Sequence, residues 1–227
     1  MLSPQVILLE HTPNPEWVVA AAARLCYSAS GVEDILERLT PERARTLVEQ
    51  LLARGHESPI EHISFTFAIE GISRACSHQL VRHRIASYSQ QSQRYVSMEQ
   101  FAYITPPTIA AQEEALAVFQ EQMVAAQAAY DRLTAMGVAQ EDARFVLPNA
   151  CETKLIMTMN ARSLHNFFAL RLCQRAQWEI RVLGEKMLEL VQPLAPSIFA
   201  HAGPSCVREG ICHEGAYSCG RLTTNHA

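Results

Sequence analysis

The positions of apolar residues along the chain predict long helices and a few short strands. Over residues 116–133 the apolar residues recur at steps of three and four, which predicts a long helix over about 111–136 that ends at Gly137. Over residues 63–69 apolar residues alternate with polar or small ones. That period is typical of a strand buried on one face.

Turn and cap residues place the other elements. Gly71 is expected to end that strand, and Ser73 to cap a helix that runs to about His83. Residues 85–98 show no clear period and predict a loop with some extended pairing, whereas 28–39 are ambiguous. Further strands are predicted over 5–10, 101–105 and 152–159, and further helices over 15–26, 41–55, 139–147, 176–191 and from Asn160 or Ser163 onwards. The mixture predicts an α+β fold: a single domain with one antiparallel or mixed sheet packed with long helices.

Composition narrows the class of protein. Of the 227 residues 48% are hydrophobic and 19% charged, which excludes bulk disorder. No apolar run approaches the length of a membrane span and no export signal is visible, so we expect no membrane partner and a cytoplasmic address. The seven cysteines are therefore expected to be reduced, with Cys26, Cys76, Cys151 and Cys173 as small core residues.

Positive charge is concentrated in one stretch of an otherwise acidic chain. The net charge is −4, yet residues 71–98 contain four Arg, two His and no Asp or Glu. Ser, Gln and Tyr lie between these cations, and they add neutral hydrogen-bonding groups to guanidinium forks that suit phosphate. A small anionic ligand fits this pattern better than an RNA-binding loop, because the chain has no second basic stretch. An exposed loop without a ligand is the remaining alternative.

A second polar stretch covers residues 159–179. Asn160 and Arg162 lie at a predicted strand-to-helix junction, where backbone N–H groups favour an anion. Asn166 shares a helix face with Arg162, whereas Arg171 follows Arg162 by nine positions and lies half a turn round. Either this helix bends, or its two faces serve two sites.

Metal sites receive little support. His56 and His62 lack the helical spacing of a zinc pair, so a loop that presents His56 and Ser58 to a ligand is favoured. In the tail, Cys206, Cys212 and Cys219 lie near His213 but without a C-x-x-C step, so free thiols are expected. Glu141 and Arg144 are interpreted as a surface pair.

One motif resembles a known family. Arg82-His83-Arg84, seven residues and then Ser92 match the signature of the flavin-dependent thymidylate synthases. The agreement continues in H-E-S-P-I-E-H, R-I-A-S-Y, S-Q-R-Y, V-L-P, N-A-R-S-L-x-N-F and A-Q-W-E-I, from about residue 17 to 192. The resemblance implies a catalytic domain over 1–201 and a cysteine-containing tail over 202–227.

The resemblance also implies a reaction. A methylene group passes from methylenetetrahydrofolate to carbon five of dUMP, reduced FAD supplies the hydride, and NADPH reduces the FAD. The family works as a homotetramer with sites where subunits meet, acts on small molecules rather than nucleic acid, and uses no metal. If one helix contributes to two neighbouring ligand sites, this would explain why Arg162 and Arg171 lie on opposite faces of it. The flavin, rather than a protein side chain, carries out the hydride transfer.

The matching positions imply three groups of site residues. Arg171 is expected to be catalytic, by stabilising the ionised uracil. The positions that match FAD contacts are Ser58, Arg82, His83, Arg84, Gln90, Asn160, Ala161, Arg162 and Asn166, with His56 near the flavin and folate. Those that match the dUMP pocket are Gln79, Leu80, Val81, Arg82, Gln90, Gln91, Ser92, Gln93, Arg94, Arg144 and Arg171.

Two positions depart from the family pattern. Gln90 stands where some members carry Glu, and Arg175 where some carry His. Ser92 is interpreted as a substrate contact rather than a nucleophile, because no His lies close in sequence to serve as its base. No G-x-G-x-x-G occurs, so a Rossmann fingerprint does not hold the FAD.

Overall fold

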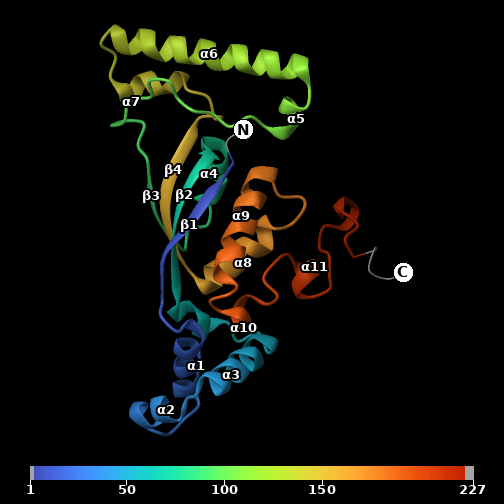
Figure 1. Ribbon diagram of the computed structural model, residues 1–227. Coiled ribbons are helices and arrows are strands. Elements are labelled where there is room, and N and C mark those ends of the chain that lie inside the picture. The colour runs from blue at the N-terminus through green and yellow to red at the C-terminus, as the bar shows by residue number, and fades with distance from the viewer. Residues whose placement is uncertain (1–2, 223–227) are drawn as a thin grey trace. The chain divides into compact units, whose positions relative to one another are not determined.

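The computed structural model describes residues 3–222 as an α+β fold around one four-stranded sheet (Figure 1). Its strands are β1 (Gln5–His11), β2 (Ser64–Ser73), β3 (Ser87–Gln90) and β4 (Glu152–Asn160), in the order β1-β2-β4-β3. The central strands β2 and β4 run antiparallel. The Thr66 hydroxyl lies 2.9 Å from that of Thr158, whereas further along β2 the Gly71 N–H donates to the earlier residue Glu152 at 2.9 Å. Residue numbers therefore rise along one strand as they fall along the other. The sheet that the sequence predicted as antiparallel or mixed is therefore antiparallel.

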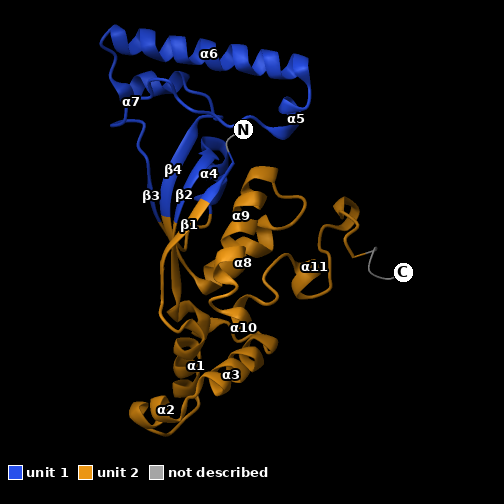
Figure 2. Ribbon diagram, viewed as in Figure 1, with its two compact units in different colours: residues 1–5, 68–82, 88–156 blue, residues 6–67, 83–87, 157–227 orange. Residues whose placement is uncertain are grey.

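The described residues fall into two compact units (Figure 2). Unit 1 comprises residues 3–5, 68–82 and 88–156, and unit 2 comprises 6–67, 83–87 and 157–222. The helices of unit 1 are α4 (Arg74–Leu80), α5 (Pro107–Ala110), α6 (Glu113–Ala135), α7 (Gln140–Ala143) and the 3₁₀ turn η2 (Arg144–Val146). Those of unit 2 are α1 (Pro15–Cys26), α2 (Val32–Arg38), α3 (Pro41–Ala53), η1 (Ser58–His62), α8 (Ala161–Arg171), α9 (Trp178–Val191), α10 (Pro196–Phe199), α11 (Ser205–Arg208) and η3 (Gly215–Tyr217).

Each unit has apolar packing that follows the sequence pattern. In unit 1 the predicted long helix is α6, whose Met123, Ala126 and Tyr130 are buried with Phe101 and Cys151. In unit 2 α1 packs against α3, and α8 against α9 (Figure 1). A close approach of α9 to α8 depends on Gly184, because a Cβ there would lie 3.3 Å from the Phe167 ring.

Side-chain caps begin the helices where the sequence predicted them. Thr40 accepts a hydrogen bond from Arg43 N–H, Ser73 from Cys76 N–H, and Asn160 from Ser163 N–H. Asn160, rather than Ser163, is therefore the N-cap of α8. The helix after Ser73 ends at Leu80 instead of about His83, because Leu80 is its last buried position and Val81 is exposed.

Two strand predictions are wrong in detail. Gly71 does not end β2, which continues to Ser73. The glycine is required because its φ is 71° and a Cβ would lie 2.5 Å from the Ser3 carbonyl oxygen. Residues 101–105 form only an isolated bridge between Tyr103 and Cys151, since Gln100 at φ 53° and Pro106 limit the extended stretch.

The ambiguous and short helical segments are now defined. Residues 28–39 contain α2, which buries only Ile35. The helix predicted over 139–147 is divided into the single turn of α7 and the 3₁₀ turn η2. Within the described residues, no helix is both long enough and apolar enough to cross a membrane.

The cysteine prediction holds in part. All seven cysteines are free thiols, and Cys76 and Cys151 are buried. Cys26 is exposed, contrary to the prediction, because α1 turns Val19, Ala20 and Ala23 inward and leaves its last residue outside. Cys173 is half-buried.

Candidate active site

Gln90 is held by a hydrogen-bond network inside unit 1. Its side-chain Nε2 donates to Ser77 Oγ and to Thr153 Oγ1, each at 3.0 Å. Ser77 already donates its hydroxyl hydrogen to the Arg74 carbonyl, so it can only accept from residue 90. The Gln90 amide therefore fits this position, and Gln90 can offer its carbonyl oxygen to a ligand.

Three arginines gather beside Glu141 and the start of α4 in unit 1. Arg94 Nε donates to the Glu141 carboxylate at 2.9 Å, and Arg144 Nε donates to the Glu141 backbone carbonyl at 3.0 Å. The predicted Glu141–Arg144 surface pair is therefore wrong, since the carboxylate binds Arg94, 47 residues away. The structure thus brings together two arginines that the sequence placed in the dUMP pocket.

Arg74 adds a third guanidinium to this group. Burial lowers its pKa, and the nearby Arg144 guanidinium lowers it further. Among the described residues no ion pair joins Arg74 or Arg144 to a carboxylate. Two cations that repel each other and lack counter-ions form a favourable place for an anion. Arg74 lies in the stretch without carboxylates, but its position is not among those that match the family's site residues.

The other unit 1 candidates lie at the end of α4 and after β3. Leu80 is buried, Gln79 is half-buried, and Val81 and Arg82 are exposed. The Leu80 carbonyl accepts from the Tyr88 hydroxyl at 2.9 Å, and burial raises the pKa of Tyr88 to about 12.

The turn after β3 carries the next candidates. Ser92 Oγ accepts from Arg94 N–H at 3.1 Å, which fixes the turn where Gln91, Ser92 and Gln93 lie half-buried.

Within unit 2, Arg162 is already paired with carboxylates. It forms a hydrogen-bonded ion pair with Glu61 and a second contact with Glu57 at 3.7 Å. The Glu61 carboxylate raises the pKa of Arg162. The sequence showed a basic stretch without nearby carboxylates, but the fold supplies them for Arg94 and Arg162. Arg208 also binds Glu57, at 2.9 Å.

His83 and Arg171 form a part-buried polar contact in unit 2. Arg171 Nε donates to His83 Nε2 at 3.1 Å, across 88 residues of sequence. The His83 ring is 7% exposed and packs edge-on against Phe167 at 5.0 Å. Burial lowers the pKa of His83 to about 4, with a further contribution from Arg171. His83 is therefore neutral at pH 7 and can accept the hydrogen bond that orients Arg171.

Arg162 and Arg171 have different partners, at opposite faces of α8. Arg162 contacts Glu57 and Glu61, whereas Arg171 contacts His83. Two faces that serve two sites remain a prediction, and this separation is consistent with it. Asn160 caps the helix, and the buried Ala161 donates its N–H to the Ile63 carbonyl at 3.0 Å.

The remaining flavin candidates are exposed donors. Ser58, Arg84 and Asn166 are exposed, as is His56. Ser58 begins η1 and lies between Glu57 and Glu61, the two carboxylates that contact Arg162. Guanidinium, amide and hydroxyl donors of this kind are chemically suited to the phosphates and ring edges of a dinucleotide.

The two buried histidines predict how stability depends on pH. The pKa values of His83 and His165 are lowered to about 4, so between pH 6.5 and 4 only the unfolded chain gains these protons. The free energy of unfolding should therefore fall as the pH drops from 7 to 5, by at most about 1.4 kcal/mol per pH unit for each histidine. Urea unfolding at fixed protein concentration measures this, and His165→Phe should reduce the slope. An unfolding free energy that is independent of pH in this window would contradict the burial of both rings.

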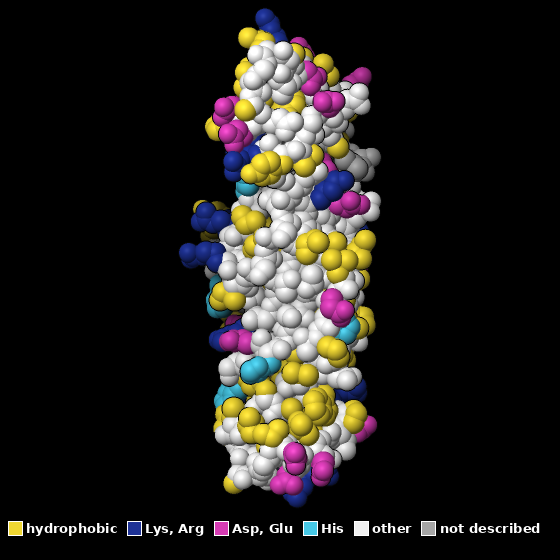
Figure 3. Space-filling model, turned by 90° about the vertical axis from the view of Figure 1, so that its left-hand side faces the viewer, with side chains coloured by type: hydrophobic (Ala, Val, Ile, Leu, Met, Phe, Trp, Pro, Cys, Tyr) yellow, Lys and Arg dark blue, Asp and Glu magenta, His cyan; other side chains and the backbone are white. Residues whose placement is uncertain are grey.

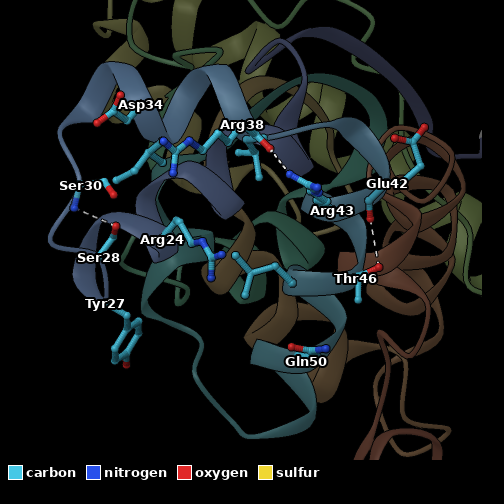
Figure 4. A pocket seen from close by; sticks show the side chains of 13 residues that line it. Arg24, Tyr27, Ser28, Ser30, Asp34, Arg38, Glu42, Arg43, Thr46 and Gln50 are labelled. Carbon is cyan, nitrogen blue, oxygen red and sulfur yellow. Dashed lines mark hydrogen bonds between the residues drawn. The ribbon is translucent and has the colours of Figure 1, made fainter.

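A pocket of about 670 Å³ lies among α1, α2 and α3 of unit 2 (Figure 4). Arg24, Arg38 and Arg43 line it together with Ser30 and Glu42, and the Arg43 guanidinium donates to the Arg38 carbonyl at 3.0 Å. None of the candidate site residues named above from the sequence lines this pocket.

The tail makes its own contacts within unit 2. Arg175 pairs with Glu214 at 3.0 Å, and its guanidinium lies 4.6 Å from the centre of the Tyr217 ring. The arginine at this family-variable position therefore holds the segment that carries Cys212 and Cys219. Over residues 3–222 no group of three or more possible ligands is placed to hold a metal ion.

Sequence reasoning missed the residues that hold the candidates in place. Thr153 and Tyr88 support the Gln90 loop, and Glu57, Glu61 and Glu141 bind the arginines. A signal existed for Glu57 and Glu61, which fall in the H-E-S-P-I-E-H segment of the family resemblance, but their partner Arg162 lies far along the chain, 101 residues after Glu61.

The chain is similar to known proteins over most of its length. A family model described as thymidylate synthase complementing protein matches residues 7–197. The flavin-dependent thymidylate synthase of Clostridium tetani is 54% identical, over 96% of this chain and 93% of its own. That of Geobacter sulfurreducens is also 54% identical, with 96% and 94% covered. A solved structure of the UMP/dUMP methylase PolB from Streptomyces cacaoi, bound with 5-Br dUMP, has a TM-score of 0.75 and 25% identity over 87% of this chain and 94% of that one.

The fold and these relatives define the class of the protein as an α+β transferase enzyme that depends on a flavin. The chain belongs to the flavin-dependent thymidylate synthase family.

Proposed function

We propose that the chain converts dUMP to dTMP, with methylenetetrahydrofolate as carbon donor, FAD as the bound flavin and NADPH as its reductant. Family membership over residues 7–197 supports the reaction class. The observation that carries the chemistry is the Arg171–His83 contact, a cation oriented by a buried neutral ring.

The residues of unit 1 are proposed to hold dUMP. Arg94 and Arg144, with Arg82, bind the phosphate, because charge-assisted hydrogen bonds to phosphate are among the strong polar contacts of proteins. Gln79, Gln91, Ser92 and Gln93 supply uncharged donors and acceptors for the sugar and base. The Gln90 carbonyl accepts from a ring N–H, since its amide hydrogens are used within the protein. Leu80 and Val81 form the apolar part of the pocket.

Arg171 is proposed to act on the uracil ring. Carbon five of uracil is a poor nucleophile, and negative charge must build up on the ring for it to react. A guanidinium held in place before the reaction stabilises that charge without reorganisation. His83 orients Arg171 and, because it is neutral, adds no competing positive charge.

The donors of unit 2 are chemically suited to FAD. Arg84, Asn166 and Ser58 are exposed donors, and Asn160 and Ala161 fix the start of α8. Arg162 is proposed to exchange part of its contact with Glu57 for a phosphate. When bound, the flavin supplies the hydride. Gln90 is proposed to touch both the flavin and the base.

We further propose a homotetramer in the cytoplasm, with sites where subunits meet. In such an assembly the two faces of α8, with Arg162 and Arg171, serve two sites. The catalytic domain is proposed to end at residue 201, and residues 202–227 form the tail.

A flavin spectrum tests the proposed function. The purified protein should be yellow or take up FAD stoichiometrically, and the flavin absorbance should bleach with NADPH. The competing class is a non-catalytic RNA-binding module that uses residues 79–95. On the face drawn in Figure 3, several Lys and Arg side chains lie beside Asp or Glu. Colourless protein that refuses FAD and binds oligonucleotides would contradict the proposal.

A further inference from the structure

A second cavity in unit 2 is lined by none of the residues proposed for the reaction, although Glu57 in its wall contacts Arg162. Its volume is about 860 Å³, within the range of small-molecule sites. Helices α3, α8, α10 and α11 contribute to its wall, and its apolar part is formed by Leu52, Ala53, Pro196, Ile198 and Ala200.

His165 of α8 lines this cavity with an unsatisfied ring. The side chain is 6% exposed, and neither Nδ1 nor Nε2 makes a hydrogen bond with a described residue. The Ile198 backbone lies near enough to influence the ring, but not in hydrogen-bonding geometry. Phe199 stacks on the ring at 5.3 Å and 18°, so the edge of the imidazole is the part left for a partner. A buried polar group without a partner is costly, and native proteins keep few of them without a reason.

The charged residues of the wall are already matched. Arg208 pairs with Glu57 at 2.9 Å, and Arg45 contacts Glu16 at 3.8 Å. Glu49 accepts from the Ser197 hydroxyl at 3.3 Å. The carboxylates of Glu49, Glu57 and Glu209 line the cavity beside the guanidinium groups of Arg45 and Arg208, so an anionic ligand would find no unopposed positive group there.

A cationic ligand is disfavoured at the other end of the cavity. Burial lowers the pKa of His165 to about 4, and the Arg208 guanidinium lowers it further, which outweighs the opposite effect of Glu57. A positive group beside the ring would face the same cost as protonation of the ring. The neutral imidazole offers one N–H donor and one nitrogen acceptor.

We propose that this cavity binds an uncharged compound of one or two rings. Its flat face lies against Leu52 and Ile198, and its amide-like edge forms a hydrogen bond with the His165 ring. The site is not part of the machinery proposed for dUMP and FAD, and the proposal does not depend on that function.

Three probes of one shape test the proposal. Benzamide, benzoate and benzamidine share a ring and differ in charge, and each is titrated by calorimetry into the full chain loaded with FAD and dUMP, and into the chain as purified. Benzamide should bind at least about tenfold more tightly than either charged probe, because burial of a charge without a counter-ion is costly. Equal binding of the three probes, or no binding of benzamide, would overturn the proposal.

A variant places the binding at His165. His165→Phe keeps the stacking on Phe199 and removes both nitrogens, so benzamide affinity should fall about tenfold. His78→Phe, at an exposed position of α4 outside the cavity, is the matched control and should bind as the unchanged protein does. Benzamide affinity that is unaltered by His165→Phe would refute the assignment.

If His165→Phe fails to fold, a crystal of the unchanged protein soaked in benzamide tests the same contact. The amide should lie in the cavity with its edge at a His165 ring nitrogen. Ordered water alone on that ring would show that solvent satisfies His165, and the proposal would fail. Because binding is measured without turnover, this failure is distinguishable from failure of the proposed reaction.

Discussion

Arg171→Ala is expected to lower kcat for dTMP formation by about a hundredfold or more, while FAD stays bound. Removal of one preorganised charge from a reacting oxyanion typically costs that much, and the arginine has no role in holding the flavin in our account. The effect should appear in kcat rather than in KM for dUMP, because the charge on the ring develops in the transition state. Steady-state kinetics together with the flavin spectrum measure both quantities.

Three variants control this prediction. Arg171→Lys keeps the charge but loses the planar fork that donates to His83, so kcat should recover only in part. His83→Ala should lower kcat through misorientation of Arg171 and weaken flavin retention. Arg132→Ala changes an exposed arginine of α6 and should leave kcat unaltered. Full turnover in Arg171→Ala would refute the role of this residue.

Arg144→Ala is expected to raise KM for dUMP by about ten- to a hundredfold, with a smaller effect on kcat. A hydrogen bond to a charged group contributes about 1.5–3 kcal/mol, which corresponds to such a factor. Arg144 suits a phosphate because its only described hydrogen bond is to a backbone carbonyl, so its charge is not neutralised. Kinetics with dUMP as the varied substrate measure the change.

Deoxyuridine, which lacks the phosphate, separates this effect from a general loss of structure. If Arg144 binds the phosphate, the unchanged protein and Arg144→Ala should use deoxyuridine equally poorly. A variant that loses deoxyuridine turnover to the same extent as dUMP turnover would show that Arg144 acts elsewhere.

Local sequence patterns account for much of the fold. The period of apolar residues in α6 and the alternation in β2 correctly predict these elements, because the apolar side chains of one face are buried along each element. The caps Thr40, Ser73 and Asn160 are equally local, since each binds a backbone N–H three residues later. Residues 101–105 have the composition of a strand, but pairing depends on neighbours that the segment cannot specify.

The candidate site was predictable in composition but not in connectivity. The motif residues stood out because arginines gathered where carboxylates were absent. Their partners lie far along the chain: Glu141 for Arg94, Glu61 for Arg162 and His83 for Arg171. No period or spacing encodes such contacts, because they arise only when strands and helices from distant segments pack together. The neutrality of His83 likewise depends on burial, which the fold creates.

A crystal structure with FAD and dUMP bound would show whether these arginines hold the substrate. We expect Arg94 and Arg144 at the phosphate of dUMP, Arg171 at the uracil edge with its hydrogen bond to a neutral His83 retained, and the donors around α8 on FAD. Ligands bound elsewhere, with these guanidinium groups directed into bulk solvent, would contradict this expectation.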